Sequence, residues 1–359
     1  MEKISAIDEK YMRRCLFLAR CGAGSTSPNP MVGAVIVCDG RIIGEGYHIR
    51  AGEPHAEVNA VNSVSANDKH LLERSTMYVS LEPCSHYGKT PPCADLIIAC
   101  KIPRVVVGVT DCNVQVNGGG IARMRAEGIE VVVDVLRDEA LDVNKIFFTN
   151  CAKKRPWITL KWAESADGYI DALRSDASCG AAKISNPVSQ VAVHKERARH
   201  DAILVGTRCA LLDNPSLDTR FWGGRSPLRL VIDREGVLPV THRLFDGEHP
   251  TVVYTASASA EKEGKNIQQI ELDFTSDVLL QIVSHLHSIK VSSLLVEGGA
   301  QLLQSFIDAS LWDAARVERN LSLLLGDGVK SPVLSAASCV ENTMIAGNEI
   351  TLYVPKKPL

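Results

Sequence analysis

The chain has 359 residues, of which 45% are hydrophobic and 23% charged, and its formal net charge at pH 7 is −3. A chain of this length exceeds one ordinary hydrophobic core and its composition is typical of soluble globular proteins, so two domains are expected. The slightly acidic balance argues against a general polyanion binder, and no apolar run reaches membrane-spanning length.

The eleven cysteines are scattered and odd in number, and no secretory signal opens the chain. We therefore expect a cytoplasmic protein in a reducing compartment, where clustered cysteines indicate metal binding or catalysis rather than disulfides. Most cysteines outside such a cluster are expected to be small core residues.

The first half predicts alternating helices and strands. A helix is expected over residues 8–21, and an apolar hairpin over 31–38 and 41–46, because Asp39-Gly40 is a strong turn dipeptide. Further strands are expected at 77–81, 104–109 and 130–135, and further helices at 56–64, 94–100 and near 120–127. This order predicts a three-layer α/β unit.

Two short stretches of this unit hold typical zinc ligands. The first is His55-Ala56-Glu57, and the second runs from Pro83-Cys84 to Cys93. One imidazole and two thiolates suit zinc, and three protein ligands leave a fourth position open for water. All three ligands fall where a loop meets a helix, and helix N-termini stabilise thiolates. Glu57 is placed to move protons, an arrangement typical of a zinc-dependent hydrolytic deaminase.

A closed structural zinc site, or a chance cluster, is the alternative. Structural sites usually have four protein ligands. Cys100 is expected on the inward face of a helix, so His86 is the main rival for the fourth ligand. We favour an open catalytic site, at which zinc-activated water attacks the amine-bearing carbon of a heterocycle and Glu57 carries the protons.

A basic, polar stretch at residues 153–156 places the domain boundary near residue 150, so the predicted domains are 1–150 and 151–359. The second domain predicts strands at 157–162, 202–205, 228–232, 251–254, 293–296 and 350–354, and helices at 187–199, 276–288 and 300–311. It is expected to be a second α/β domain, with an exposed turn at 257–265.

Signals for nucleotide binding in this domain are weaker. No Gly-x-Gly-x-x-Gly is present, but Glu297-Gly298-Gly299 follows an apolar strand and precedes a helix. A glycine pair at such a turn lets a phosphate approach the helix N-terminus. Lys161 lies within an apolar strand, so it either reaches solvent or faces a substrate or cofactor.

The first half resembles the deaminase half of bifunctional riboflavin-biosynthesis deaminase/reductases, through residues 28–36, 46–48, 55–57 and 82–93. The eight residues between Cys84 and Cys93 differ from the Cys-x-x-Cys spacing of nucleic-acid and cytidine deaminases and match the riboflavin branch. The resemblance implies a diaminopyrimidinone substrate that carries a phosphoribosylamino group. It implies that Asn29 contacts the pyrimidine and that the ribose phosphate is surrounded by His48, His86 and Lys89. Ordinary surface positions are the alternative for His48 and Lys89.

The resemblance continues in residues 156–168, 206–220 and 296–299, which match the family's reductase domain. That domain has the dihydrofolate reductase fold and uses NADPH to reduce the ribosyl group to ribityl, so Zn²⁺ and NADPH are the implied cofactors. By resemblance Lys161 is catalytic, and the substrate contacts are Arg197, Ser216, Arg220 and Glu297. The implied cofactor contacts are Ala163, Lys183, Cys209, Asp213, Gly298 and Gly299. Solvated surface positions are the alternative for Arg197 and Arg220.

The chain departs from the family pattern at several positions. Cys209, Lys183 and Arg234 stand where Thr, Trp and Ser are usual, and Cys112 and Val114 stand where prolines are usual. The zinc motif is unchanged, so these departures concern the NADPH contacts more than the type of reaction.

The sequence thus predicts a cytidine-deaminase-like three-layer α/β/α domain followed by a dihydrofolate-reductase-like α/β domain. The expected partner is a small-molecule substrate, with no nucleic acid or membrane, and a homo-oligomer is expected. The rivals are a nucleic-acid deaminase and a non-catalytic zinc module fused to a nucleotide-binding domain. Acidic residues slightly outnumber basic ones in residues 1–150, which disfavours the first rival.

Overall fold

The computed structural model describes residues 5–85, 87, 91–112 and 118–356. The chain divides into two compact units, Met1–Lys154 and Arg155–Leu359. Within the described ranges, every helix is too short or too polar to cross a membrane.

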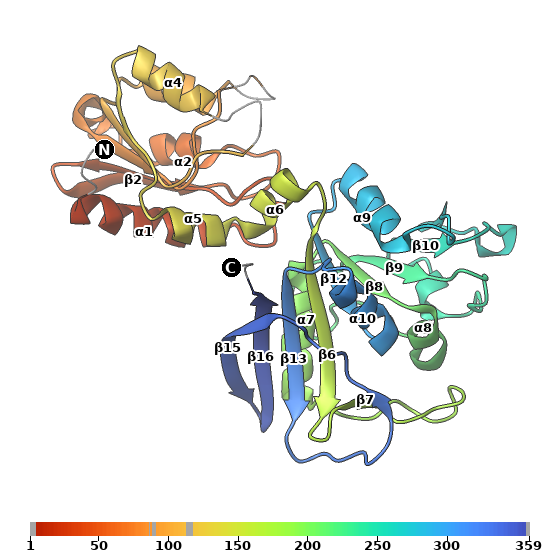
Figure 1. Ribbon diagram of the computed structural model, residues 1–359. Coiled ribbons are helices and arrows are strands. Elements are labelled where there is room, and N and C mark those ends of the chain that lie inside the picture. The colour runs from red at the N-terminus through yellow and green to blue at the C-terminus, as the bar shows by residue number, and fades with distance from the viewer. Residues whose placement is uncertain (1–4, 86, 88–90, 113–117, 357–359) are drawn as a thin grey trace. The chain divides into compact units, whose positions relative to one another are not determined.

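The first unit is built on one five-stranded sheet (Figure 1), in the order β2-β1-β3-β4-β5. Its strands are β1 (Gly33–Cys38), β2 (Arg41–Tyr47), β3 (Thr76–Val79), β4 (Arg104–Val107) and β5 (Glu130–Val132). β1 runs antiparallel to β2 and β3, whereas β3, β4 and β5 are parallel. The predicted hairpin is confirmed, with Cys38 opposite Arg41 across the turn.

Helices cover both faces of this sheet. One face carries α1 (Ala6–Arg20) and α5 (Arg137–Val143), and the other carries α2 (Ala56–Ser63), α3 (Cys93–Ala99) and α4 (Gly119–Ala126). Side chains alternate along a strand, so Ala34 and Ile36 pack under α2 and α3, while Val35 and Val37 pack under α1. The predicted three-layer arrangement is confirmed.

The first unit ends in two helices that were not predicted, α5 and α6. α6 (Lys145–Lys153) follows α5 directly, and a short 3₁₀ helix (Lys69–Arg74) precedes β3. The boundary predicted near residue 150 falls inside α6. α6 is stabilised because Phe147 and Phe148 pack against the same hydrophobic core as α1. It ends at Lys154, whose backbone adopts the left-handed conformation.

The second unit contains a nine-stranded sheet in the order β11-β10-β9-β8-β12-β6-β13-β16-β15. Its strands are β6 (Trp157–Ser165), β8 (Ala202–Val205), β9 (Leu228–Ile232), β10 (Thr251–Thr255), β11 (Ile267–Glu271), β12 (Ser293–Glu297), β13 (Ala314–Asn320), β15 (Ala337–Ile345) and β16 (Asn348–Pro355). The strands from β11 to β13 are parallel, and β16 and β15 close the edge as an antiparallel pair. β7 (Tyr169–Asp171) and β14 (Val329–Lys330) form a separate small pair.

The helices of the second unit are α7 (Pro187–Arg199), α8 (Thr207–Asp213), α9 (Val278–Ser288) and α10 (Ala300–Asp308), with 3₁₀ turns at Arg243–Phe245 and Ala260–Lys262. One sheet face packs against α9 and α10 through Leu286 and Phe306, and the other packs against α8 through Ala210. The predicted α/β class is confirmed, and the predicted helix over 187–199 has the observed bounds. α8, β7, β11, β13, β14 and β15 were not predicted.

The predicted exposed turn over residues 257–265 is exposed at most positions, but Lys262 within it is buried, and its ammonium donates to Asp233 Oδ2 at 2.6 Å. The expectation for the remaining cysteines is wrong. The cysteines outside the predicted zinc motif are mostly not core residues, since only Cys15 and Cys38 are buried. The others lie in loops, at helix ends or on the edge strand β15, where side chains retain some access to solvent.

The buried Arg229 is expected to contribute strongly to the stability of the second unit. It is fully buried, donates to Asp246 Oδ1 at 2.8 Å, and also bonds Thr251 Oγ1 and the carbonyls of Arg243 and His249. Replacing Arg229 by Met should lower the free energy of unfolding by about 3–5 kcal/mol, because the buried partners lose their donor. Urea titration measures the change. Arg199→Met, which removes an exposed charge, should cost less than about 1 kcal/mol, and equal costs would contradict the argument.

Candidate functional site

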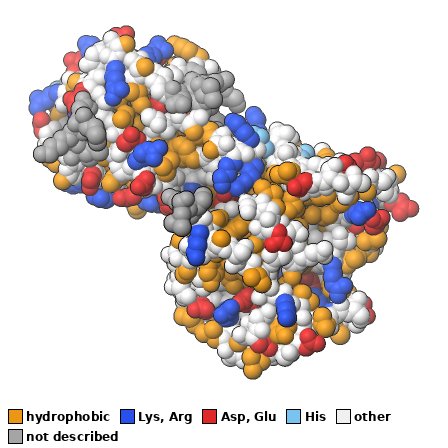
Figure 2. Space-filling model, in the orientation of Figure 1, with side chains coloured by type: hydrophobic (Ala, Val, Ile, Leu, Met, Phe, Trp, Pro, Cys, Tyr) orange, Lys and Arg blue, Asp and Glu red, His pale blue; other side chains and the backbone are white. Residues whose placement is uncertain are grey.

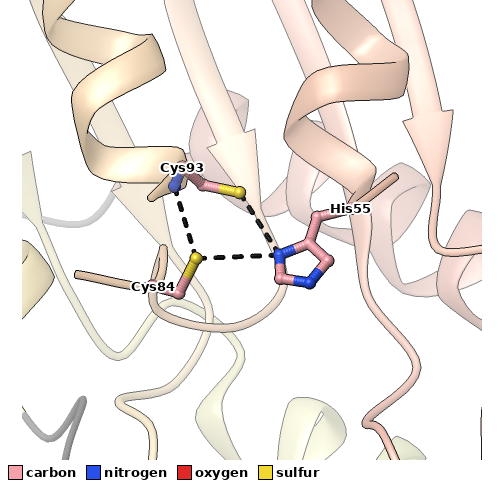
Figure 3. A group of neighbouring side chains, drawn as sticks. All are labelled: His55, Cys84 and Cys93. Atoms are coloured by element: carbon pink, nitrogen blue, oxygen red, sulfur yellow. Dashed lines mark hydrogen bonds between the residues drawn. The ribbon is translucent and has the colours of Figure 1, made fainter. Parts of the chain in front are cut away.

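Three ligand-type side chains converge in the first unit (Figure 3). His55 is the N-cap of α2, Cys93 is the first residue of α3, and Cys84 follows β3. The Nδ1 atom of His55 lies 3.7 Å from Cys84 Sγ and 3.4 Å from Cys93 Sγ. All three ligand atoms lie within 4.8 Å of one another. The structure therefore brings together the three residues predicted as ligands.

The donor set fits a tetrahedral zinc ion. Usual zinc–sulfur and zinc–nitrogen bond lengths place two ligand atoms about 3.6 Å apart along a tetrahedron edge, close to the two sulfur–nitrogen distances found. The backbone N–H of Cys93 donates to Cys84 Sγ at 3.3 Å. Contact with the Cys93 side chain, followed by contacts with His55 and this N–H, lowers the pKa of Cys84 to about 4. Cys84 is thus held as a thiolate, the form that binds metal.

A fourth ligand is the point on which the open and closed site differ. In the ranges that the structure describes, the group contains no further His, Cys, Asp or Glu, and Cys100 is not part of it. His86, the rival ligand, lies outside the described residues. So does Lys89, the predicted phosphate contact.

Glu57 lies in the first turn of α2, next to the ligands. Its side chain is buried, with 3% of its surface exposed. Burial raises the pKa of Glu57 to about 7. A carboxyl group with this pKa can both accept and donate a proton near neutral pH, as a general acid–base requires.

His48 and Asn29 form a pair beside this group. His48 Nδ1 lies 3.2 Å from the carbonyl oxygen of Pro54, so it donates, and Nε2 accepts from Asn29 Nδ2 at 3.2 Å. Burial lowers the pKa of His48. The ring of His48 stands edge-on to that of His55, with centroids 5.4 Å apart. Both nitrogens of His48 have partners in the protein, and Nε2 contacts the amide of Asn29, the predicted pyrimidine contact.

Glu82 opens the stretch 82–93 and had no predicted role, and the structure gives it one. It is buried, and its Oε2 accepts from the N–H groups of Asp111 at 3.2 Å and Gly118 at 3.0 Å. Its Oε1 accepts from Gly120 at 3.1 Å and Ile121 at 3.3 Å. One carboxylate thus fixes the backbone around Pro83-Cys84. A carboxylate that is buried at the end of a strand needs hydrogen-bond donors. The position of Glu82 directly after an apolar strand was therefore the sequence feature that could have predicted its role.

Replacing Glu82 by Gln should weaken zinc binding about tenfold or more, as losses of supporting contacts typically do. The glutamine amide nitrogen would face two N–H donors, so one pair of hydrogen bonds is lost. Competition with a chromophoric chelator measures the change. Glu73→Gln is the control, because Glu73 is exposed and paired only with Lys101 in the described structure. Unchanged zinc affinity in the Glu82 variant would show that these bonds do not support Cys84.

The second unit holds a large cleft of about 1350 Å³ at the carboxyl ends of its parallel strands. Ligands of parallel α/β sheets bind at this edge. The cleft is lined by most of the predicted reductase residues, namely Lys161, Ala163, Lys183, Arg197, Cys209, Asp213, Glu297, Gly298 and Gly299.

Three charged residues meet in this cleft. Lys161 of β6 lies opposite Glu297 of β12 in the parallel register, so the two side chains project on the same side of the sheet. Arg197 of α7 donates to both oxygens of Glu297, at 3.1 and 2.7 Å. Burial opposes ionisation of Glu297, but Arg197 and Lys161 outweigh it and lower its pKa to about 2. Burial lowers the pKa of Lys161.

The glycine pair forms the turn before α10. Gly298 and Gly299 have φ angles of 88° and 70°, in the region that favours glycine. A side chain at Gly298 would also meet Cys209, because a Cβ built there lies 2.6 Å from Cys209 Sγ. The turn therefore leaves its backbone open to the cleft, as the sequence analysis expected.

Arg174 was missed by sequence reasoning. It is buried in the wall of the cleft, where Nη2 donates to Asp213 Oδ1 at 2.6 Å and Nε donates to Asp171 Oδ2 at 2.7 Å. It lies in a loop with no apolar periodicity, so the sequence offered no signal for it. Asp213, a predicted cofactor contact, is thus already held in an ion pair.

Two predicted substrate contacts do not line the cleft. The Arg220 side chain is half-exposed, and its Nη1 donates to Asp218 Oδ1 at 2.6 Å. Ser216 Oγ accepts from Arg243 at 3.5 Å. Both follow α8 in the chain. Arg220 is linked to the charged cluster through Asp218, because the Asp218 carbonyl accepts from Arg197 Nη1 at 3.2 Å.

Comparisons with known proteins cover both units. Residues 5–109 match the cytidine and deoxycytidylate deaminase zinc-binding region, and residues 156–337 match the RibD C-terminal domain. The riboflavin biosynthesis protein RibD of Aquifex aeolicus is 36% identical over 352 residues, covering 97% of this chain and 96% of that protein.

Solved structures agree over the full length. A diaminohydroxyphosphoribosylaminopyrimidine deaminase/5-amino-6-(5-phosphoribosylamino)uracil reductase from Thermotoga maritima is 35% identical, with a TM-score of 0.87 and coverage of 97% of this chain and 99% of that one. RibD of Acinetobacter baumannii is 29% identical, with a TM-score of 0.87 and coverage of 98% and 99%.

Proposed function

This chain belongs to the bifunctional riboflavin-biosynthesis deaminase/reductase family, and from that premise we propose which residues carry each of its two reactions. The family predicted from the sequence is confirmed. The protein is a riboflavin-biosynthesis enzyme with a zinc-binding deaminase domain and an NADPH-using reductase domain. We assign deamination to residues 1–154 and reduction to residues 155–359. We propose that the deaminase domain acts on diaminohydroxyphosphoribosylaminopyrimidine and the reductase domain on 5-amino-6-(5-phosphoribosylamino)uracil, the compounds named for the Thermotoga maritima relative.

The convergence of His55, Cys84 and Cys93 beside a buried Glu57 is the observation that carries the deaminase assignment. These three residues would hold zinc, which when bound would supply the activation of water. Glu57, buried in the first turn of α2 beside these ligands, would serve as the acid–base group: it would pass one proton from water to the ring and a second from the added hydroxyl to the leaving amine. Asn29 binds the pyrimidine, and His48 fixes the orientation of its amide.

In the second unit, the glycine turn of Gly298 and Gly299 admits the cofactor phosphates to the cleft. NADPH supplies the hydride when bound. Lys161 faces the substrate with a positive charge, and Arg197 and Glu297 hold each other in place beside it. Lys183, Ala163, Cys209 and Asp213 form the rest of the cofactor wall.

Removal of zinc tests the assignment of deamination to the first unit and of reduction to the second. Dialysis against a chelator should abolish ammonia release, because the ligands would have no metal to activate water. NADPH oxidation with a previously deaminated substrate should be unchanged, and added Zn²⁺ should restore ammonia release. Ammonia and absorbance at the NADPH band are followed together. Ammonia release that persists in zinc-free protein would refute the assignment.

The distribution of charged side chains argues against a nucleic-acid substrate. Basic side chains are interspersed with acidic ones on the visible face of each unit (Figure 2), whereas nucleic-acid enzymes concentrate them. A gel-shift assay at low salt should therefore detect no complex. The cytoplasmic location and the homo-oligomer remain predictions, and light scattering on the purified protein tests the second.

A further inference from the structure

Arg174 joins two carboxylates in the wall of the cleft of the second unit. It lies in the loop after β7, its side chain is buried, and Nη2 donates to Asp213 Oδ1 at 2.6 Å. Nε donates to Asp171 Oδ2 at 2.7 Å. All three residues line the cleft, so this ion-pair network is part of the surface that a ligand of the cleft meets.

The remaining contacts of Arg174 fix its position. Nη1 donates to the carbonyl of Cys179 at 3.2 Å and to that of Leu212 at 3.5 Å. The carbonyl of Arg174 itself accepts from Arg208 Nη2 at 2.6 Å. Because Arg208 lies in the first turn of α8 and Asp213 is its last residue, Arg174 fastens the loop after β7 to both ends of that helix.

Asp213, in contrast, keeps access to the cleft. Its side chain is 30% exposed, whereas that of Arg174 is 4% exposed. Asp213 Oδ2 accepts from Cys209 Sγ at 3.5 Å, and the same sulfur lies 2.6 Å from the Cβ position built on Gly298. Only Cys209 therefore separates the Asp213 carboxylate from the glycine turn at which the cofactor phosphates are proposed to enter.

A carboxylate at this place has two opposing effects on a dinucleotide. It can accept a hydrogen bond from a ribose hydroxyl, as an acidic residue does in other dinucleotide sites. Its negative charge also repels the phosphates, and the repulsion is strong where little water screens it. A guanidinium paired with one carboxylate oxygen offsets this charge and fixes the group, while the carboxylate retains lone pairs for the hydroxyl.

We propose that Arg174 is a positioning residue of the reductase, which holds Asp213 in the orientation that accepts a ribose hydroxyl of NADPH and offsets its charge beside the cofactor phosphates. The proposal rests on the proposed function of Asp213 as a cofactor contact. Arg174 acts through Asp213 rather than on NADPH directly, because each nitrogen of its guanidinium already has a partner in the protein.

The test measures the Kd of NADPH for the zinc-loaded full-length protein from the fluorescence of the bound cofactor. Arg174→Met should raise this Kd about tenfold or more, the usual scale for losing a hydrogen bond between charged groups. At saturating NADPH, kcat should change by less than about threefold, because the lost interaction concerns binding of the cofactor. Arg174→Lys keeps the cation and should recover much of the affinity.

Asp213→Asn separates positioning from a structural role. In that background Arg174→Met should change the Kd of NADPH by less than about twofold, because the group that Arg174 positions has already been altered. A loss of the same size with and without Asp213→Asn would mean that Arg174 only supports the fold, and would overturn the proposal. Parent affinity in Arg174→Met, with weakened binding in Asp213→Asn, would overturn it while leaving Asp213 as a cofactor contact.

The premise and the fold have their own outcomes. Parent affinity in Asp213→Asn would remove Asp213 from the cofactor contacts, and the proposal would fall with that assignment. If Arg174→Met does not fold, Arg174→Gln, which keeps a donor and much of the side-chain volume, is compared in the same two backgrounds with the same criteria. Arg199→Met, at the exposed end of α7, is the control and should bind NADPH like the parent protein.

Discussion

Glu57→Gln should bind zinc normally and yet release ammonia roughly 10²- to 10⁴-fold more slowly than the parent protein, the usual contribution of a positioned acid–base group. Glutamine keeps the shape of the buried side chain but can no longer accept a proton from water. The effect should be confined to the first unit, so NADPH oxidation with deaminated substrate should continue. Ammonia release, metal content and NADPH absorbance are measured on the same preparation.

The control is Glu53→Gln, because Glu53 precedes the same helix but is exposed. It should leave both rates unchanged. Ammonia release at a near-normal rate in the Glu57 variant would mean that another group moves the proton. Loss of zinc from that variant would instead mean that Glu57 supports the metal site.

Lys161→Ala should slow NADPH oxidation roughly 10²-fold, the typical loss when one polar group facing a reacting centre is removed, and should leave ammonia release intact. Lys161 is the cation opposite Glu297 in the cleft, and its removal also leaves the Glu297–Arg197 pair without its neighbouring charge. The two reactions are followed separately, with each unit's own substrate.

Lys161→Met keeps the apolar stem and serves as the second variant, since truncation in a packed strand can disturb folding. Lys265→Ala, at an exposed position outside the cleft lining, is the control and should change neither rate. An equal loss of both reactions in the Lys161 variants would indicate a folding defect rather than a role in reduction.

Local patterns predicted a large part of the fold. The hairpin of β1 and β2 is set by Asp39-Gly40, and α7 begins at Asn186-Pro187, where the Asn186 side chain accepts from two N–H groups of the first turn. β13 could not be found in this way. Arg316 and Glu318 interrupt its apolar residues, yet both are buried on this strand, which lies between β6 and β16, and Glu318 is held by Ser185 and Asn348.

The functional sites show the same contrast between what local sequence patterns predict and what only the tertiary structure reveals. The residue types and spacing at His55, Glu57, Cys84 and Cys93 determined by themselves that this is a zinc-dependent deaminase motif, because a metal's choice of ligands is a property of the side chains. Only the tertiary structure decided the tasks of residues whose partners are distant in the chain. Glu82 meets N–H groups near residue 120, and Arg174 meets Asp213. Buried polar groups must find partners wherever the fold supplies them, and that choice leaves no local pattern.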